Sequence, residues 1–409
     1  MTRPHSWIGA AEAAALLQVS RPTLYAYVSR GLIRSQDTPG PSRERRYARD
    51  DVERLRQRAE ERRHPDKAAA QAMHWGLPIL ESSLTYIDGR ALYFRGEDAR
   101  ALAESRTIAD VASLLWTGRY GTAFPAASVE TTRMARAAGP LPFVPRAQIV
   151  LASVRDPLAF DLRPERVALT GWRILGLLTA TATTMQAEAP PRRREPPAPL
   201  AIEQRLARAW RLRAEAADLV RRALILCADH ELNVSSFTAR CVASAGSHPY
   251  AVTIAALAAL EGSRHGGATA RVDAMLDALR RARVKTSALA DRLRRGEPVD
   301  GVGHPLYRDG DPRAIALIEA LRAGWPRSAE LAFMLDVARA AESVTGERPN
   351  LDFALVGVER VLRLPPGSAL TLFAIGRAIG WIGHAIEQYA IAQLIRPRAK
   401  YVGPMPAAR

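Results

Sequence analysis

The stretch from Ala223 to Thr269 constrains the fold of this 409-residue chain more than any other. It opens with an apolar run that breaks at the sequence DHELN, which begins at Asp229. A long alanine-rich pattern then predicts a single helix, which stops at the sequence GSRHGG around His265. Because glycine adopts backbone conformations that other residues avoid, we expect a sharp turn at this point. The pattern predicts a mostly buried helical unit with one histidine near each end, His230 and His265.

Three short motifs follow this stretch in order. They are GVGH ending at His304, DPR ending at Arg313, and NLDF containing Asp352. With DHELNVS at Asp229 and HGG at His265, they form an ordered series of five over about a third of the chain, which is more than chance matching produces. The series resembles the signatures of the citrate synthase family. The resemblance implies a mainly α fold with two domains, and helical periodicity along most of the chain agrees with it.

Composition indicates the class of protein and its cellular compartment. Hydrophobic residues make up 48% and charged residues 24%, which is typical of a soluble globular protein. The two cysteines, Cys227 and Cys241, lie in apolar helical sequence, so we expect core residues and neither a disulfide nor a metal site. The N-terminus lacks the pattern of a signal peptide, and the most apolar run, Leu370 to Ile395, contains charged residues. We therefore expect a buried core helix there and a cytoplasmic protein.

The first residues of the chain follow a different pattern. Residues 7–33 predict two short helices joined by a tight turn, with Ser20 as the N-cap of the second helix, Pro22 in its first turn and Gly31 at its end. A basic strand-like segment follows, and then a helix that begins near Asp50. This arrangement resembles the MerR/excisionase type of winged helix-turn-helix. The resemblance implies DNA binding, and a helical hairpin used for protein contacts is the alternative.

The candidate DNA contacts lie at the start of the second helix and in the basic segment, or wing. Helix-turn-helix proteins contact bases and phosphates from the first turn of this helix, and basic residues of the wing hold phosphates. The candidates are Arg21, Thr23, Tyr25 and Tyr27 in the helix, and Arg43, Arg45 and Arg46 in the wing. The net charge of +16 does not decide the matter, because acidic small molecules are also partners of basic proteins.

The remaining landmarks set the expected domain boundaries. Residues 76–98 alternate apolar and polar positions around Asp88-Gly89, which predicts a β-hairpin similar to the one that begins the citrate synthase fold. A proline-rich tract at 189–199 predicts an exposed loop. We expect a helix-turn-helix and linker at 1–67 and a synthase-like domain at 68–409, with a large domain of about 75–265 and 353–409 and a small domain of about 266–352.

The resemblance also implies a reaction. Citrate synthase-type chemistry takes a proton from the methyl group of acetyl-CoA, adds the enolate to the keto carbon of oxaloacetate and hydrolyses the thioester. A carboxylate removes such a weakly acidic proton only where a preorganised donor stabilises the developing oxyanion. The matching motifs place the base at Asp352, the donor to the thioester oxygen at His265, and the donor to the keto oxygen at His304.

Oxaloacetate brings two carboxylates, and guanidinium groups bind carboxylates in bidentate fashion. The resemblance implies a substrate pocket made by His230, Arg313, Arg377 and Arg396. Arg396 would come from the partner subunit, so a homodimer with a shared active site is implied. Arg308 is the candidate for the phosphates of coenzyme A, followed by the basic run of Arg280, Arg281, Arg283 and Lys285. Acetyl-CoA is expected as a co-substrate, with no bound cofactor and no metal.

Each site residue also has a structural reading when taken alone. His230 can be a satisfied core histidine, Arg377 can pair with Glu387 or Asp352, and Asp352 can cap the helix that follows it. At the whole-protein level, two hypotheses from different classes stand. The first is an active synthase fused to a DNA-binding module, and the second is a regulator whose synthase-like domain senses oxaloacetate or acyl-CoA without turnover. A sensor needs the arginines but not the base.

Departures from the family pattern leave the acyl group open. Thr269 and Pro305 stand where other residue types are common, and the sequence after Asp352 lacks the usual aromatic and Ser-Gly. The resemblance places the first two positions on the side of the active site that binds coenzyme A. Acetyl-CoA and propionyl-CoA differ by one methylene, which discriminates weakly in a pocket, so both acyl groups remain candidates.

Overall fold

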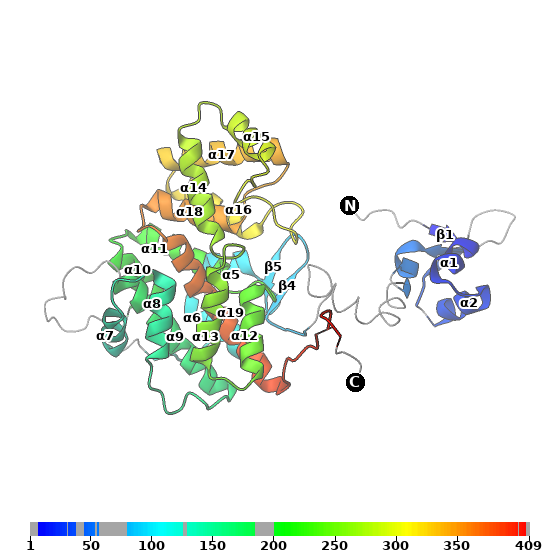
Figure 1. Ribbon diagram of the computed structural model, residues 1–409, viewed down its shortest axis with the longest axis horizontal. Coiled ribbons are helices and arrows are strands. Elements are labelled where there is room, and N and C mark those ends of the chain that lie inside the picture. The colour runs from blue at the N-terminus through cyan, green and yellow to red at the C-terminus, as the bar shows by residue number, and fades with distance from the viewer. Residues whose placement is uncertain are drawn as a thin grey trace. The chain divides into compact units, whose positions relative to one another are not determined.

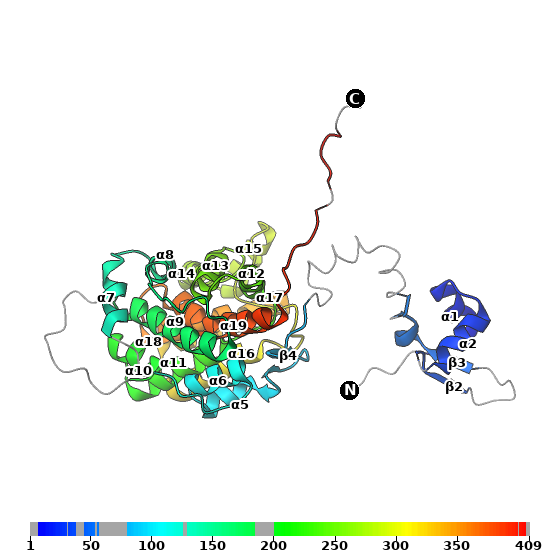
Figure 2. The ribbon, with the colours of Figure 1, turned by 90° about the horizontal axis from the view of Figure 1, so that it is seen from below.

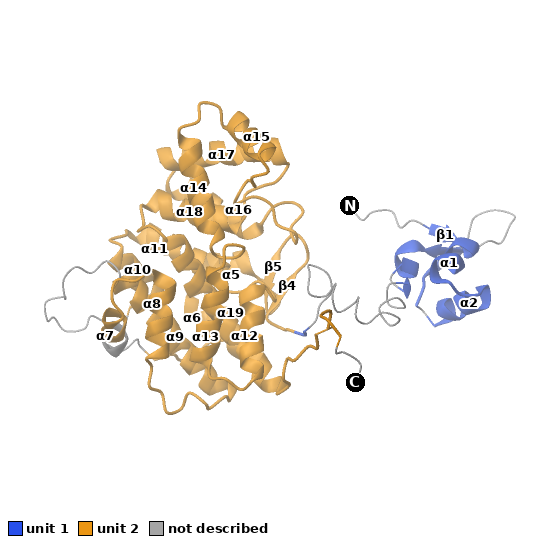
Figure 3. Cartoon of the chain, in the orientation of Figure 1, with its two compact units in different colours: residues 1–81 blue, residues 82–409 orange. Residues whose placement is uncertain are grey.

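The chain forms two compact units, residues 1–81 and residues 82–409, shown in Figure 3. The computed structural model describes residues 7–30, 32–37, 45–53, 55–56, 80–125, 129–184, 200–399 and 401–405. Each unit has its own cluster of buried apolar side chains. The proline-rich tract at 189–199 and most of the predicted linker lie outside the described residues.

The first unit is a small sheet with two helices. Its elements are β1 (Trp7–Gly9), α1 (Ala10–Leu17), α2 (Arg21–Ser29), β2 (Ser35–Asp37) and β3 (Arg45–Ala48). The sheet is antiparallel in the order β1-β3-β2, and residues 49–53 continue as a helix. Ser20 caps α2 as predicted, because its Oγ accepts the backbone N–H of Thr23 at 3.4 Å, and a proline follows in the first turn. The predicted helix-turn-helix is confirmed; Gly31 and Arg43 lie outside the described residues.

The second unit opens with the predicted hairpin. Its strands are β4 (Thr85–Ile87), β5 (Leu92–Phe94) and β6 (Glu97–Asp98), all paired antiparallel. Asp88 forms the turn, since its Oδ1 accepts the backbone N–H groups of Arg90 and Ala91 at 2.8 Å, and Gly89 takes a left-handed φ of 89°. Leu84 and Phe94 are fully buried and attach the hairpin to the helical body.

The rest of the second unit is helical. Its helices are α5 (Ala99–Ser105), α6 (Ile108–Thr117), α7 (Val129–Ala137), α8 (Phe143–Ala152), α9 (Pro164–Thr184), α10 (Ile202–Ala209), α11 (Ala214–Leu226), α12 (Val234–Ser244), α13 (Pro249–Glu261), α14 (Ala268–Arg280), α15 (Lys285–Arg294), α16 (Pro312–Gly324), α17 (Ala329–Thr345), α18 (Leu351–Leu362) and α19 (Ser368–Ile391). Helices α14 to α18 gather at one end, with α16 and α14 against α18 and α15 against α17 (Figure 1). The predicted mainly α fold is confirmed.

Helix α19 is the centre of this unit. It packs against α6, α9, α11, α12, α13 and α18, and Figures 1 and 2 show it running between these helices. Among the described residues it is the one helix long and apolar enough to cross a membrane by composition, yet 94% of its apolar window is buried inside the protein. The observed burial is that of a core helix, as the charged residues in this run predicted.

One predicted element is wrong. The alanine-rich pattern after Asn233 predicted a single long helix, but the structure has two, α12 and α13, separated at residues 245–248. Gly246 has a left-handed φ of 75°, which ends the first helix. His248 begins the second, because its Nδ1 accepts the backbone N–H of Ala251 at 3.2 Å, and Pro249 occupies the first turn. The Gly-Ser-His-Pro sequence was a stop-and-start signal inside the alanine-rich pattern.

Candidate active site

The predicted site residues converge where α11, α16, α18 and α19 meet. His230 lies in the loop between α11 and α12, His265 follows α13, and His304 lies in the loop before α16. Asp352 is in the first turn of α18, and Arg377 is in α19. Arg377 acts electrostatically on His230, His265 and Asp352, so these residues from separate elements share one region.

Two histidines and a tyrosine form one wall of this region. The rings of His230 and His304 lie edge to face with centroids 4.9 Å apart, and each also contacts the ring of Tyr307. The Nε2 of His230 lies 2.9 Å from the Tyr307 hydroxyl. Burial, followed by the nearby positive charge of Arg313, holds the pKa of His230 well below its ordinary value. His230 is therefore neutral at physiological pH.

His304 is neutral with a defined tautomer. Burial, and then the charge of Arg313, lowers its pKa to about 4. The Nδ1 of His304 accepts the backbone N–H of Leu306 at 3.2 Å, so this nitrogen carries no proton. The ring proton is thus on Nε2, and His304 offers one N–H donor.

His265 is held through Ser235. The Ser235 Oγ lies 2.8 Å from His265 Nε2, and it accepts the indole N–H of Trp381 at 3.0 Å. The Ser235 hydroxyl also donates to the Oδ1 of Asn233 at 2.8 Å, an oxygen that accepts the backbone N–H groups of Ser235 and Ser236 as well. The one hydroxyl proton has two acceptors within reach, Asn233 Oδ1 and His265 Nε2, so these contacts are compatible with either tautomer of His265. Burial lowers the pKa of His265 to about 3, so the ring is neutral.

The glycines around His265 serve close packing. Neither Gly266 nor Gly267 takes a left-handed φ, so the sharp turn expected here has a different cause. A Cβ at Gly266 would stand 2.8 Å from the Leu260 carbonyl oxygen, and one at Gly267 would stand 2.9 Å from the Glu261 carbonyl oxygen. The chain around His265 folds back onto the end of α13 too closely for any side chain.

Asp352 presents a carboxylate that no helix cap uses. Asn350 is the N-cap of α18, and its Oδ1 accepts the backbone N–H groups of Asp352 and Phe353 at 3.1 and 3.4 Å. The Oδ1 of Asp352 is buried without a hydrogen-bond partner. Burial raises the pKa of Asp352 to about 7. A carboxyl group with this pKa is ready both to accept and to release a proton near neutrality.

Arg313 is buried against a carboxylate of its own motif. Its Nε and Nη2 donate to the two oxygens of Asp311 at 2.9 and 2.8 Å. Burial by itself lowers the pKa of Arg313, but Asp311 outweighs burial and the net pKa is raised. The Nη1 edge lies outside this pair. Asp311 also accepts the backbone N–H of Leu351 at 3.0 Å, which ties Arg313 to the start of α18.

Arg377 has a donor with nothing to bind. Its Nε donates to the carbonyl oxygen of Cys227 at 2.7 Å, and its guanidinium carbon lies 4.9 Å from the centre of the Phe373 ring. Its Nη2 is buried without a hydrogen-bond partner. Burial lowers the pKa of Arg377 to about 10, so it stays charged at neutral pH. Glu387 pairs with Arg240 at 3.0 Å, not with Arg377.

The other predicted contacts lie outside this cluster. Arg308 and Arg396 are both exposed, and Arg396 belongs to the exposed segment after α19. In the basic run, Arg280 is paired with Glu330 and lies over the ring of Phe333, while Arg283 and Lys285 line an open groove of about 330 Å³.

In the first unit, the predicted DNA contacts lie on α2 and β3. Arg21, Tyr25, Arg45 and Arg46 are exposed. Thr23 is half-buried and its hydroxyl lies 2.9 Å from that of Ser20, so part of its bonding capacity serves the helix cap.

Comparison with known proteins identifies both units. The model of the citrate synthase C-terminal domain matches residues 72–398, which is most of the chain. The chain belongs to the citrate synthase family. Citrate synthase 2 of Bacillus subtilis is 29% identical over 80% of this chain and 95% of its own length. The 2-methylcitrate synthase 1 of Corynebacterium glutamicum is 34% identical over 46% of this chain and 51% of its own.

A solved structure agrees with this citrate synthase fold. The crystal structure of citrate synthase from Thermotoga maritima superposes with a TM-score of 0.67 at 27% identity, covering 82% of this chain and 96% of that one. The helix-turn-helix domain model matches residues 7–60, which lie in the first unit.

The sequence motifs assigned no role to several residues of the site. Tyr307, Trp381 and Asn350 all stand within or next to motifs, but nothing in the sequence told which ring or amide each would contact. Ser235 is the serine of the DHE-x-N-x-S signature, and its spacing from His265 becomes a contact only through the α12–α13 turn.

Proposed function

We propose that this citrate synthase-family chain condenses an acyl-CoA with oxaloacetate, releasing CoA and citrate, or 2-methylcitrate if the acyl group is propionyl. The observation that carries the proposal is the state of Asp352. Its buried, unpartnered oxygen and its pKa of about 7 suit a base, and a sensor has no use for one. Two neutral histidines, His265 and His304, stand in the same region.

In the proposed first step, Asp352 takes a proton from the α-carbon of the acyl-CoA. The electron pair of the broken C–H bond moves into the thioester carbonyl and forms an enolate. The proposed tautomer of His265 carries its proton on Nδ1, and this N–H donates to the enolate oxygen while Ser235, itself bound by Trp381, contacts the other ring nitrogen. A neutral donor suits an enolate, because preorganised hydrogen bonds stabilise charge that develops only in the transition state.

In the second step, the enolate carbon attacks the keto carbon of oxaloacetate. The Nε2–H of His304 donates to the keto oxygen as it gains charge. The Nη2 of Arg377 and the Nη1 edge of Arg313 are the proposed contacts of the carboxylates, and His230 completes the pocket. Water then adds to the thioester carbonyl carbon and the C–S bond breaks. The proton held by Asp352 and a proton of the water pass to the CoA thiolate and to the alkoxide oxygen, which gives CoA and the hydroxyl of the product. Arg308 is the proposed contact of the CoA phosphates.

The decisive experiment is an assay of free CoA released from oxaloacetate with acetyl-CoA and with propionyl-CoA, beside a calorimetric titration of oxaloacetate alone. We expect oxaloacetate binding and CoA release with at least one acyl-CoA. Oxaloacetate binding without CoA release from either acyl-CoA would overturn the catalytic proposal and favour the sensor. The ratio of kcat/KM for the two acyl-CoA substrates identifies the preferred acyl group.

We propose DNA binding as the function of the first unit. Supporting it are the helix-turn-helix match and the exposure of Arg21, Tyr25, Arg45 and Arg46 on α2 and β3. Selection from a random DNA pool with the full chain should enrich one motif. Retention of DNA that is sensitive to salt but enriches no motif would show that net charge alone is responsible.

We also propose that the chain acts as a homodimer in the cytoplasm, with Arg396 entering the partner's pocket. The exposure of Arg396 in the segment after α19 supports a role in a neighbouring chain. The division of the second unit into large and small domains that close over the substrates is part of the same proposal.

A further inference from the structure

A buried carboxylate and a buried imidazole lie next to each other beside two of the proposed oxaloacetate-binding residues, His230 and Arg377. The Oδ1 of Asp229 lies 3.2 Å from the Nε2 of His384, within ion-pair distance but without hydrogen-bond geometry, and both side chains are wholly buried. Asp229 directly precedes His230 in the loop between α11 and α12. His384 lies on α19, seven residues after Arg377. The contact thus joins the two elements that carry a pocket histidine and a pocket arginine.

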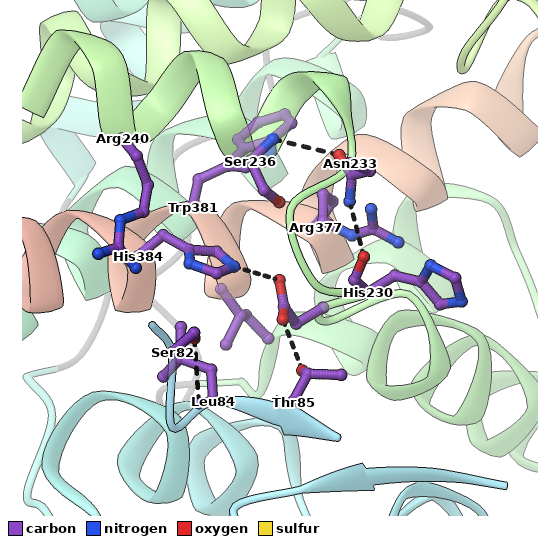
Figure 4. A network of polar contacts seen from close by, with 12 residues as sticks. Ser82, Leu84, Thr85, His230, Asn233, Ser236, Arg240, Arg377, Trp381 and His384 are labelled. Carbon is purple, nitrogen blue, oxygen red and sulfur yellow. Dashed lines mark hydrogen bonds and ion pairs between the residues drawn. The ribbon is translucent and has the colours of Figure 1, made fainter. Parts of the chain in front are cut away.

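The same carboxylate also holds the hairpin. The hydroxyl of Thr85, in β4, donates to the Oδ2 of Asp229 at 2.5 Å. Figure 4 shows His384 on the left and Thr85 below it, while His230 and Arg377 lie together on the right. Loop, core helix and hairpin, which are distant in sequence, therefore meet at one side chain.

The loop lies directly on α19. The backbone N–H of Gly380 donates to the Ala228 carbonyl oxygen at 2.8 Å, and a Cβ at Gly380 would stand 2.4 Å from both this oxygen and the Oδ1 of Asp229. Arg377, Gly380 and His384 are spaced three and four residues apart, so they follow one face of the helix. That face presents, in order, a substrate-binding arginine, a contact with the loop backbone and the partner of Asp229.

The loop conformation needs this support. Glu231, the residue after His230, has a left-handed φ of 51°, which a residue with a Cβ adopts only when its surroundings hold it. Asp229 supplies a charge for that purpose. Burial by itself raises the pKa of Asp229, but His384 and then Arg377 outweigh burial and keep the pKa below its ordinary value. A buried carboxylate of this kind is stable only where its partners are in place.

We propose that Asp229 is a positioning residue for oxaloacetate: by binding its own loop to the His384 face of α19, it sets the place of His230 relative to Arg377. The inference rests on the proposed function, because it assumes that both residues contact the same substrate. Asp229 would not touch substrate itself. Its loss would loosen the geometry of the oxaloacetate pocket and leave the acyl-CoA side intact.

The test is Asp229→Asn in the full-length protein, which keeps the size of the side chain and removes the charge. We expect the KM and Kd for oxaloacetate to rise about 10- to 100-fold, the scale of a misplacement of roughly 1 Å, with the KM for acyl-CoA unchanged. The matched control is Asp156→Asn. Asp156 is also a buried carboxylate, bound by Arg166, Arg173 and Tyr250, and it has no contact with the pocket residues. It should lower thermal stability without changing either KM.

A double-mutant cycle separates positioning from stability. In a His230→Ala background, Asp229→Asn should raise the oxaloacetate KM several-fold less than it does alone, because the residue it positions is gone. Equal effects in both backgrounds, or an equal loss for both substrates, would overturn the inference. If Asp229→Asn fails to fold, Thr85→Val takes its place, since it removes one hydrogen bond from the same carboxylate and keeps the shape of the side chain.

Hydrogen exchange tests the same point without substrate. The backbone amides of residues 228–233 should exchange faster in Asp229→Asn than in the unchanged protein, with no such change in Asp156→Asn. Unchanged exchange there would overturn the proposed anchoring. Failure of the proposed function shows elsewhere, as an absence of oxaloacetate binding or CoA release in the unchanged protein.

Discussion

The Oδ1 of Asn350 accepts the backbone N–H of Asp352 at 3.1 Å, so the helix α18 is capped by Asn350, two residues before the proposed base, and not by the base itself. This division leaves the Asp352 carboxylate unengaged at the helix start. It also means that Asp352 can be changed without removing the cap.

Asp352→Asn should therefore keep the fold and the oxaloacetate affinity while lowering kcat by about 10²- to 10⁴-fold, the usual contribution of a general base. Steady-state kinetics and oxaloacetate calorimetry on the same preparation check this. As a control, Asn350→Ala should lower thermal stability by about 1 kcal/mol through loss of the cap. An Asp352→Asn enzyme with full turnover would remove Asp352 from the mechanism.

The pH dependence follows from the raised pKa of Asp352. The base must be ionised, so kcat/KM should fall as pH drops through about 7 and level off above it. His265 and His304, with pKa values of about 3 and 4, are neutral throughout and add no second inflection between pH 5 and 8. A profile that is flat from pH 5.5 to 8.5 would contradict the assignment.

The same shift predicts a cost in stability. Between an unfolded pKa near 3.8 and a folded pKa of about 7, the folded protein binds a proton that the unfolded chain does not, so this group's contribution to stability falls as pH rises through that window. Asp352→Asn should be more stable than the unchanged protein at pH 8, and the difference should vanish toward pH 4. Thermal melts at both pH values measure it.

Changes at Arg377 and Arg308 should each raise the KM of a different substrate. Arg377→Lys should raise the oxaloacetate KM by about 10- to 100-fold, because a charge-assisted hydrogen bond is worth roughly 1.5–3 kcal/mol and lysine lacks the planar fork. Arg308→Ala should instead raise the acyl-CoA KM and leave the oxaloacetate KM unchanged. The crossed comparison is informative since each variant is the control for the other. Identical effects on both substrates would show general loss of structure.

Arg396 offers a test of a shared site. If it enters the partner's pocket, a heterodimer of one Asp352→Asn chain and one Arg396→Ala chain contains one pocket with both residues intact. Activity should then return to about half of the unchanged dimer, while each parent homodimer remains impaired. Differently tagged chains allow purification of the mixed species. Verified heterodimers without recovered activity would count against the sharing.

The wing and the recognition helix should differ in their effects on DNA binding. The double change Arg45→Ala and Arg46→Ala should weaken binding to all sequences and flatten its salt dependence, since wing contacts are to phosphate. Tyr25→Ala should alter which sequence is preferred. Thr23→Val tests the same helix with a confounding effect, because the Thr23 hydroxyl contacts the cap residue Ser20. Salt titrations against a selected site and a scrambled site measure both.

The sequence predicted local features well and contacts at a distance poorly. The cap at Ser20 and the turn at Asp88 depend on neighbouring residues, and the structure has both. The break between α12 and α13 was missed because a run of helix-favouring alanines obscured Gly246. The site motifs predicted which residues would matter, but not their partners.

The partners depend on packing. Ser235 reaches His265 because two helices fold back on each other, and Asp311 takes up half of the Arg313 guanidinium. His384 lies in apolar sequence and matches no motif, so its sequence context predicts no partner. Its contact with Asp229, 155 positions away, follows from a helix packing that periodicity alone does not specify.

The central place of α19 has a consequence for how the protein is made. Every helix that it packs against precedes it in the chain, so on the ribosome each of them is synthesised while the apolar surface that will cover it does not yet exist. The nascent chain therefore exposes the apolar helix faces that α19 later covers. Chaperones bind exposed apolar surface of this kind. A chain whose translation stops before Ser368 would lack α19, and the apolar faces that pack against this helix would stay exposed.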